Sequence, residues 1–194
     1  MLSARLRGSS DRIVLPLARV LAKVASPNAV TAFGLVSSLL AALAFASRAL
    51  SMAFLFLLLA SVADLLDGAV AKASGRVTEL GGFLDSVTDR YSDSLILLGL
   101  MLYLERYYLL IFMVLTGSLL VSYTRARAEL LIPRCEVGVA ERAERLLILL
   151  VATLLAALGV RGIDPFLGAL VLLAILTHLT VLQRVLFTRS SLGP

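Results

Sequence analysis

The chain has 194 residues, of which 60% are hydrophobic and 16% are charged, and its mean hydropathy is +0.98. This composition excludes an ordinary soluble domain and predicts an all-α integral membrane protein, because apolar runs recur along the whole length. The formal net charge of +5 does not call for nucleic acid as a partner, since basic residues at cytoplasmic helix ends and nearby anionic membrane lipids account for it.

The N-terminal segment predicts a helix that lies on the membrane surface. Between Ser3 and Ala25, apolar residues recur among arginines at helical spacing, which is typical of an amphipathic interfacial helix. The first 28 residues lack the continuous apolar core of a cleavable signal peptide, and we expect none. We assign residues 1–28 to this interfacial segment.

Six apolar segments follow and predict six transmembrane helices. Gly75 predicts a break between the second and the third. We expect one membrane domain over residues 29–187 and a cytoplasmic tail over residues 188–194. The six segments cover residues 29–47, 49–73, 78–104, 107–124, 146–160 and 165–183, and the fifth reaches spanning length when it is extended back through the ERAER sequence.

The basic residues predict the orientation of these segments. With both termini on one side, only Arg48, Arg106 and Arg161 of the 18 Lys and Arg residues fall on the far side. By the positive-inside rule the side of the termini is cytoplasmic. We therefore expect a multi-pass protein of the cell (plasma) membrane, with its most polar segment at the cytoplasmic face.

That polar segment carries four aspartates between apolar runs. Asp64 and Asp67 are three residues apart and Asp85 and Asp89 are four apart, so each pair projects from one side of its own helix. A single carboxylate at membrane depth costs at least about 2.5 kcal/mol, and four together require a compensating cation. Oxygen ligands favour Mg²⁺, Mn²⁺ or Ca²⁺. The sequence therefore predicts a metal site near the membrane surface.

The spacing of this segment resembles the signature D-x2-D-G-x2-A-R-x8-G-x3-D-x3-D of the CDP-alcohol phosphotransferases, integral membrane enzymes of phospholipid synthesis. Lys72 is the one departure, because the family has Arg there. Pro27, Asn28 and Thr31 also resemble the "PNxxT" sequence at the start of the family's first span. The matching signature residues are Asp64, Asp67, Gly68, Ala71, Gly81, Asp85 and Asp89.

The resemblance implies transfer of a lipid phosphate from a CDP-linked lipid to an alcohol, with release of CMP. It further implies a homodimer and two Mg²⁺ or Mn²⁺ ions held by Asp64, Asp67, Asp85 and Asp89, with Asp89 also the general base. The residues implied to contact the CDP-lipid are Pro27, Asn28, Ala29, Val30, Thr31, Gly68, Ala71, Lys72, Thr78 and Gly81.

Two further sequences bear on the acceptor alcohol. SYTRARAE (residues 122–129) and ERAERL (residues 141–146) resemble segments of the phosphatidylinositol-phosphate synthases within this family. The resemblance implies myo-inositol 1-phosphate as the acceptor and Arg125, Arg127, Arg145 and Arg184 as its phosphate ligands. The lipid tails of the donor stay open between CDP-diacylglycerol and CDP-archaeol.

Three alternatives remain at this stage. A phosphatidylglycerophosphate synthase would also present basic residues to its acceptor, glycerol 3-phosphate. The arginines could be topological anchors at cytoplasmic helix ends. The acidic cluster could serve a small cation transporter, although that interpretation does not account for the glycine and alanine spacing. Release of CMP distinguishes an enzyme from a transporter.

Overall fold

The structure, a computed structural model, describes residues 15–160, 162 and 164–193. Within this part of the chain every regular element is helical, which confirms the predicted all-α class. The elements are α2 (Pro27–Ala46), α3 (Leu50–Ala73), α4 (Glu79–Tyr103), the short 3-10 helix η1 (Glu105–Tyr107), α5 (Tyr108–Ala128), α6 (Arg142–Ala157) and α7 (Pro165–Leu192).

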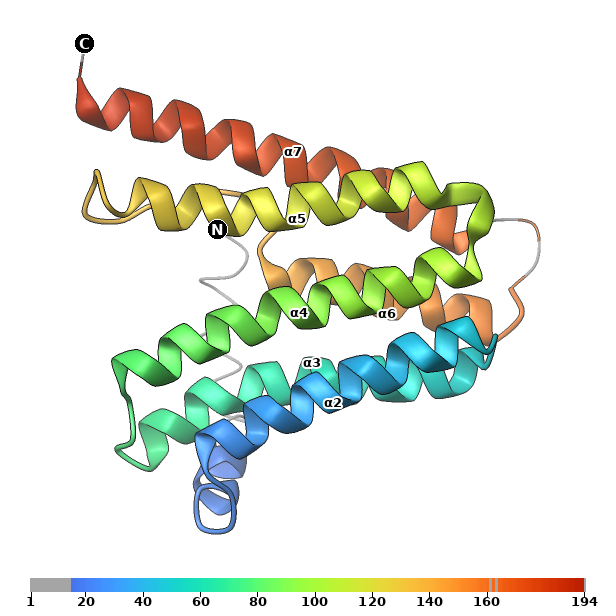
Figure 1. Cartoon of the computed structure of the whole chain (residues 1–194), viewed down its shortest axis with the longest axis horizontal. Helices are drawn as coiled ribbons and strands as arrows, with labels where there is room; N and C mark the ends of the chain where they lie inside the picture. Colours follow the sequence, from blue (N-terminus) through green and yellow to red (C-terminus); the bar gives the residue numbers. More distant parts are fainter. Residues whose placement is uncertain (1–14, 161, 163, 194) are drawn as a thin grey trace.

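These helices run up and down in one bundle (Figure 1). Helices α2 and α3 pack together, α5 and α7 pack together, and α4 and α6 join the two pairs: α4 contacts α2 and α5, and α6 contacts α3 and α7. The start of α2, the end of α3 and the start of α4 lie at the same end of the bundle as the α5–α6 connection (Figure 1). This end gathers segments that are far apart in sequence.

Four segments are long and apolar enough to cross a membrane, namely α2, α3, Glu105–Ala128 and α7. Helix α4 is long enough at 25 residues but carries Asp85, Asp89, Arg90 and Asp93, whereas α6 is apolar but has only 16 residues. The predicted count of six spans therefore goes beyond these four.

Local sequence explains where the helices near this end begin and stop. Ser26 caps α2 by accepting a hydrogen bond from the amide of Ala29 at 3.2 Å, and Thr78 caps α4 by accepting one from Gly81 at 3.0 Å. Both are hydroxyl residues of the kind preferred at helix N-caps. After α3, Gly75 adopts a φ of +66°, which glycine tolerates without strain, so the chain turns there as predicted.

A tight contact between α2 and α4 sets the distance between the first helix and the aspartate-bearing helix. A Cβ built on Gly99 would overlap the backbone of Ala42, so only glycine permits this approach. Farther from the polar end, Phe45 and Phe166 stack edge to face with ring centroids 6.3 Å apart. The apolar core therefore holds α2, α4 and α7 in a fixed relation.

The ends of the chain extend the bundle. Residues 15–21 are helical, and Leu21 packs against Val30 and Ala63, while residues 3–14 of the expected interfacial helix lie outside the described residues. At the other end, α7 continues to Leu192, so most of the expected tail over residues 188–194 is helical.

Candidate active site

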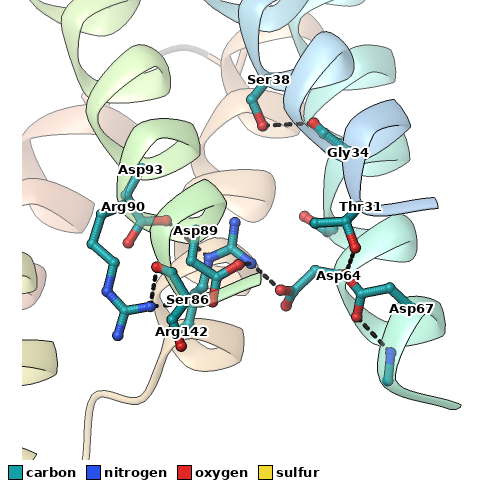
Figure 2. A network of polar contacts seen from close by, with 12 residues as sticks. Thr31, Gly34, Ser38, Asp64, Asp67, Ser86, Asp89, Arg90, Asp93 and Arg142 are labelled. Atoms are coloured by element: carbon teal, nitrogen blue, oxygen red, sulfur yellow. Dashed lines mark hydrogen bonds and ion pairs between the residues drawn. The ribbon is translucent and has the colours of Figure 1, made fainter. Parts of the chain in front are cut away.

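The four aspartates lie on two neighbouring helices, Asp64 and Asp67 on α3 and Asp85 and Asp89 on α4. Asp64 and Asp89 point toward the space between α3, α4 and α6 (Figure 2). Within the described residues, no three His, Cys, Asp or Glu side chains converge closely enough to hold a metal ion in this conformation. A basic side chain that the sequence analysis did not single out lies between Asp64 and Asp89 instead.

Arg142, the first residue of α6, inserts its guanidinium between the two helices (Figure 2). Its Nη1 donates a hydrogen bond to Oδ1 of Asp64 and lies 2.6 Å from Oδ1 of Asp89, and its Nε donates to Oδ1 of Asp93 at 3.1 Å. The Arg142 side chain is only 17% exposed. Its position one helical turn before Arg145 was the signal in the sequence that could have drawn attention to it.

Asp67 connects the start of α2 to α3. Its Oδ2 accepts a hydrogen bond from the hydroxyl of Thr31 at 3.1 Å, and its Oδ1 accepts one from the amide of Gly68 at 2.6 Å. Thr31 also donates to the carbonyl of Pro27 at 3.2 Å. The predicted "PNxxT" segment and Asp67 therefore form one unit.

A cavity of about 190 Å³ opens beside this unit. Eight of the ten residues predicted to contact the CDP-lipid line this cavity, whereas Ala29 and Val30 do not. Arg76 also lines it and adds a second positive charge beside that of Lys72, which the sequence analysis missed. The lining residues are Pro27, Asn28, Thr31, Asp67, Gly68, Ala71, Lys72, Arg76, Val77, Thr78, Gly81, Gly82 and Asp85.

The chemistry of the aspartates fits a hard divalent cation. All four candidate ligands offer carboxylate oxygens, the donors that Mg²⁺ and Mn²⁺ prefer. Oδ1 of Asp85 is buried and has no hydrogen-bond partner, and a buried carboxylate oxygen in that position is destabilised unless a proton or a cation reaches it. Asp85 lies in the same cavity lining as Asp67. A cation between them would satisfy this oxygen.

The predicted acceptor arginines come from three helices at the same end of the bundle. Arg125 and Arg145 each lie near enough to Arg184 for their charges to repel its own. Arg145 is buried and donates to Oδ2 of Asp93 at 2.7 Å and to the carbonyl of Ala140 at 3.0 Å. Arg125 forms a 3.0 Å ion pair with Glu129.

Arg184 and Arg127 line a second cavity of about 440 Å³ formed by residues of α5 and α7. Arg184 is 2% exposed and donates hydrogen bonds to the carbonyls of Val137, at 2.9 Å, and Val121. Arg127 is exposed. Arg145 and Arg184 therefore also hold the α5–α6 connection in place, while Arg125 and Arg127 are freer to meet a solute.

The apolar bundle, with acidic and basic side chains collected at one end, defines a helical membrane protein with a polar centre at that end of the bundle. The sequence matches the profile of the CDP-alcohol phosphatidyltransferase family over residues 24–188. The chain therefore belongs to this family and is a transferase, as the signature predicts.

Individual relatives agree with this assignment. The chain is 38% identical over 179 residues to the archaetidylinositol phosphate synthase of Pyrococcus horikoshii, covering 90% of this chain and 91% of that protein. This chain is also 31% identical in sequence to the phosphatidylinositol phosphate synthase of Mycobacterium tuberculosis in two crystal structures. The structure with CDP-DAG bound gives a TM-score of 0.79 and covers 91% of this chain and 94% of that one. The structure in complex with manganese and citrate gives 0.78, with coverage of 90% and 88%.

Proposed function

We propose that this protein transfers the lipid phosphate of a CDP-linked lipid to a hydroxyl of myo-inositol 1-phosphate, yielding a phosphatidylinositol-phosphate-type lipid and CMP. The observation that carries the proposal is the cavity of about 190 Å³, which brings the predicted CDP contacts beside Asp67 and Asp85. The names of the relatives in Pyrococcus horikoshii and Mycobacterium tuberculosis support inositol phosphate as the acceptor.

The donor end of the reaction belongs to the α2–α3–α4 cavity. Lys72 and Arg76 supply two positive charges for the diphosphate, and charge-assisted hydrogen bonds to phosphate are among the stronger polar contacts. A Cβ placed on Gly68 would meet no atom within 4 Å, so glycine leaves this wall of the cavity open to the ligand. The CDP group would thereby lie with its diphosphate toward the aspartates.

The chemical step needs a proton acceptor and charge neutralisation. Asp64, Asp67, Asp85 and Asp89 would hold two Mg²⁺ or Mn²⁺ ions, which would neutralise the diphosphate and assist departure of CMP. Asp89 would accept the proton of the attacking hydroxyl as the new O–P bond forms and the P–O bond to CMP breaks. Its side chain is 22% exposed, so it is partly shielded from water yet reachable by the acceptor.

The acceptor would bind through its phosphate to Arg125, Arg127, Arg145 and Arg184. Arg guanidinium groups bind phosphate through paired N–H donors. The closeness of Arg184 to Arg125 and to Arg145 supports this assignment, because neighbouring cations are stabilised by an anionic ligand. The same residues would also accept glycerol 3-phosphate, so the acceptor must be tested directly.

We place this chemistry at the cytoplasmic face of the plasma membrane. Helices α4 and α6 lie alongside the four long apolar segments (Figure 1), which supports six spans. An even number of spans puts both termini on one side, and the basic residues predict that this side is cytoplasmic. A homodimer within the membrane is part of the proposal.

The proposal is tested by release of CMP from purified protein in liposomes with Mg²⁺ or Mn²⁺. The donors would be CDP-diacylglycerol and CDP-archaeol, and the acceptors myo-inositol 1-phosphate, inositol, glycerol 3-phosphate and serine. We expect CMP with inositol 1-phosphate. If CMP is released with glycerol 3-phosphate and with no other acceptor, the assignment of the donor site stands and the assignment of inositol 1-phosphate as the acceptor is overturned. A lack of CMP with every combination would overturn the proposed reaction.

A further inference from the structure

Arg142 occupies an unusual place for a cation. It is the first residue of α6, and a positive charge at a helix N-terminus is opposed by the helix dipole. Its side chain is also largely buried, at 17% exposure. Both conditions destabilise a guanidinium unless specific partners compensate. The compensation comes from three carboxylates.

Two of these carboxylates, Asp64 and Asp89, come from different helices and share Nη1 of Arg142. This is the arrangement in which a small cation would bridge α3 to α4. The third, Asp93, is bound separately through Nε at 3.1 Å and also accepts a hydrogen bond from Arg145. The guanidinium therefore has one partner, Asp93, that is not a candidate metal ligand.

The space around these groups leaves little room for a second cation. The void lined by Asp64, Asp67, Asp89, Arg142 and neighbouring residues measures about 10 Å³, which is at the lower limit for one water molecule. A divalent cation with its coordinating oxygens cannot share Asp64 and Asp89 with Arg142 in this arrangement. Binding of the divalent cation therefore requires the Arg142 guanidinium to move away from Asp64 and Asp89.

We propose that Arg142 is a tethered counter-cation that competes with the divalent cation for Asp64 and Asp89. Without the cation, the single positive charge of the guanidinium reduces the repulsion between the two carboxylates and holds α6 against α3 and α4. When the cation binds, Nη1 leaves Asp64 and Asp89 while Nε stays anchored to Asp93. Arg142 is thus a positioning residue that couples the metal ligands to the Asp93–Arg145 pair. This inference rests on the metal-ligand role proposed above for Asp64 and Asp89.

The test is Mn²⁺ binding to the purified protein, followed through the electron paramagnetic resonance signal of free Mn²⁺. Arg142→Gln should bind Mn²⁺ about tenfold more tightly than wild type, because the competing charge is gone. Arg90→Gln is the matched control, since Arg90 lies 3.8 Å from Asp89 and also donates to the carbonyl of Ser86. It removes the same charge nearby without vacating the bridging position. The increase in Mn²⁺ affinity of Arg90→Gln over wild type should stay below about threefold.

Thermal unfolding provides the second readout. In EDTA, Arg142→Gln should unfold at a lower temperature than wild type, because Asp64 and Asp89 then repel each other without a counter-cation. Mn²⁺ should reduce this difference and leave only the part that comes from the contact between Arg142 Nε and Asp93. Arg142→Lys keeps the positive charge on a shorter side chain and should have an Mn²⁺ affinity between those of wild type and Arg142→Gln. This variant replaces Arg142→Gln in the test if the Gln variant does not fold.

Equal or weaker Mn²⁺ binding by Arg142→Gln, or an equal gain in the Arg90→Gln control, would overturn the competition. If wild type binds Mn²⁺ and Asp64→Asn does not, the metal assignment survives such a result. Failure of both wild type and Arg142→Gln to bind Mn²⁺ would instead remove the metal assignment, and the inference with it.

Discussion

Arg145 of α6 donates a 2.7 Å hydrogen bond to Asp93 of α4, and its side chain is 6% exposed. A residue expected to bind the acceptor phosphate is therefore also a buried link between two helices. Arg125, by contrast, is 43% exposed and forms its ion pair with Glu129 within α5 and its C-cap. Substitutions of these two arginines should act in different ways.

Arg125→Gln should raise the KM for inositol 1-phosphate by about tenfold, the loss expected for one charge-assisted contact, with an unchanged unfolding temperature. Arg145→Gln should raise the same KM and also lower the free energy of unfolding by about 3 kcal/mol, because Asp93 loses a buried partner. Steady-state CMP release and thermal unfolding measure both. Arg134→Gln, whose ion pair with Glu136 is exposed, is the control and should change neither. An equal increase in the KM for the CDP-lipid would remove Arg125 from the acceptor site.

Asp89→Asn should lower kcat by at least about 100-fold, because an amide cannot accept the proton of the attacking hydroxyl. Binding of the CDP-lipid should persist, since the donor cavity is lined by other residues. The matched control is Asp164→Asn, the same substitution at the start of α7, which should retain turnover. Substantial turnover by the Asp89 variant would show that another group takes the proton.

Lys72→Arg should lower the KM for the CDP-lipid by about threefold to tenfold, because a guanidinium binds a diphosphate through paired donors whereas an ammonium is a point charge. Lys72 lines the donor cavity, so the KM for the acceptor should not move. Lys72→Met should shift the donor KM in the opposite direction. A donor KM insensitive to both changes would place the diphosphate away from Lys72.

Asp164 should make protein stability depend on acid pH. Burial opposes ionisation of this carboxyl, but the Tyr107 hydroxyl at 2.7 Å, the amides of Leu167 and Phe166, and Arg106 outweigh it and hold the pKa of Asp164 below its ordinary value. A lowered folded-state pKa stabilises the fold above the unfolded value of about 3.9 and loses this effect as the pH falls through the folded value.

Thermal unfolding of wild type and Asp164→Asn across pH 3 to 7 measures this contribution. The wild type should unfold at a higher temperature near neutral pH, and the difference should shrink below about pH 4. Asn can still cap α7, so the comparison isolates the charge. A difference that is constant with pH would mean that the charge of Asp164 does not contribute.

The sequence by itself determined the features that depend on neighbours along the chain. The pairing of aspartates three and four residues apart, the hydroxyl cap at Thr78 and the turn at Gly75 follow from helix period and backbone preference. The grouping of half of the predicted CDP contacts was also foreseeable, because these five lie within two turns of an aspartate on α3 or α4, namely Gly68, Ala71, Lys72, Thr78 and Gly81. These local rules do not require the positions of other helices.

Only the tertiary structure decided which distant charges meet. Arg142 is 78 residues from Asp64, and no spacing rule relates them. The side chain reaches the aspartates because α6 packs against α3 with its N-terminus at their end of the bundle. The buried roles of Arg145 and Arg184 likewise depend on Asp93 and on the path of the α5–α6 connection. Helix period determines the face of the helix on which a side chain lies, whereas helix packing determines which residues of other helices that side chain contacts.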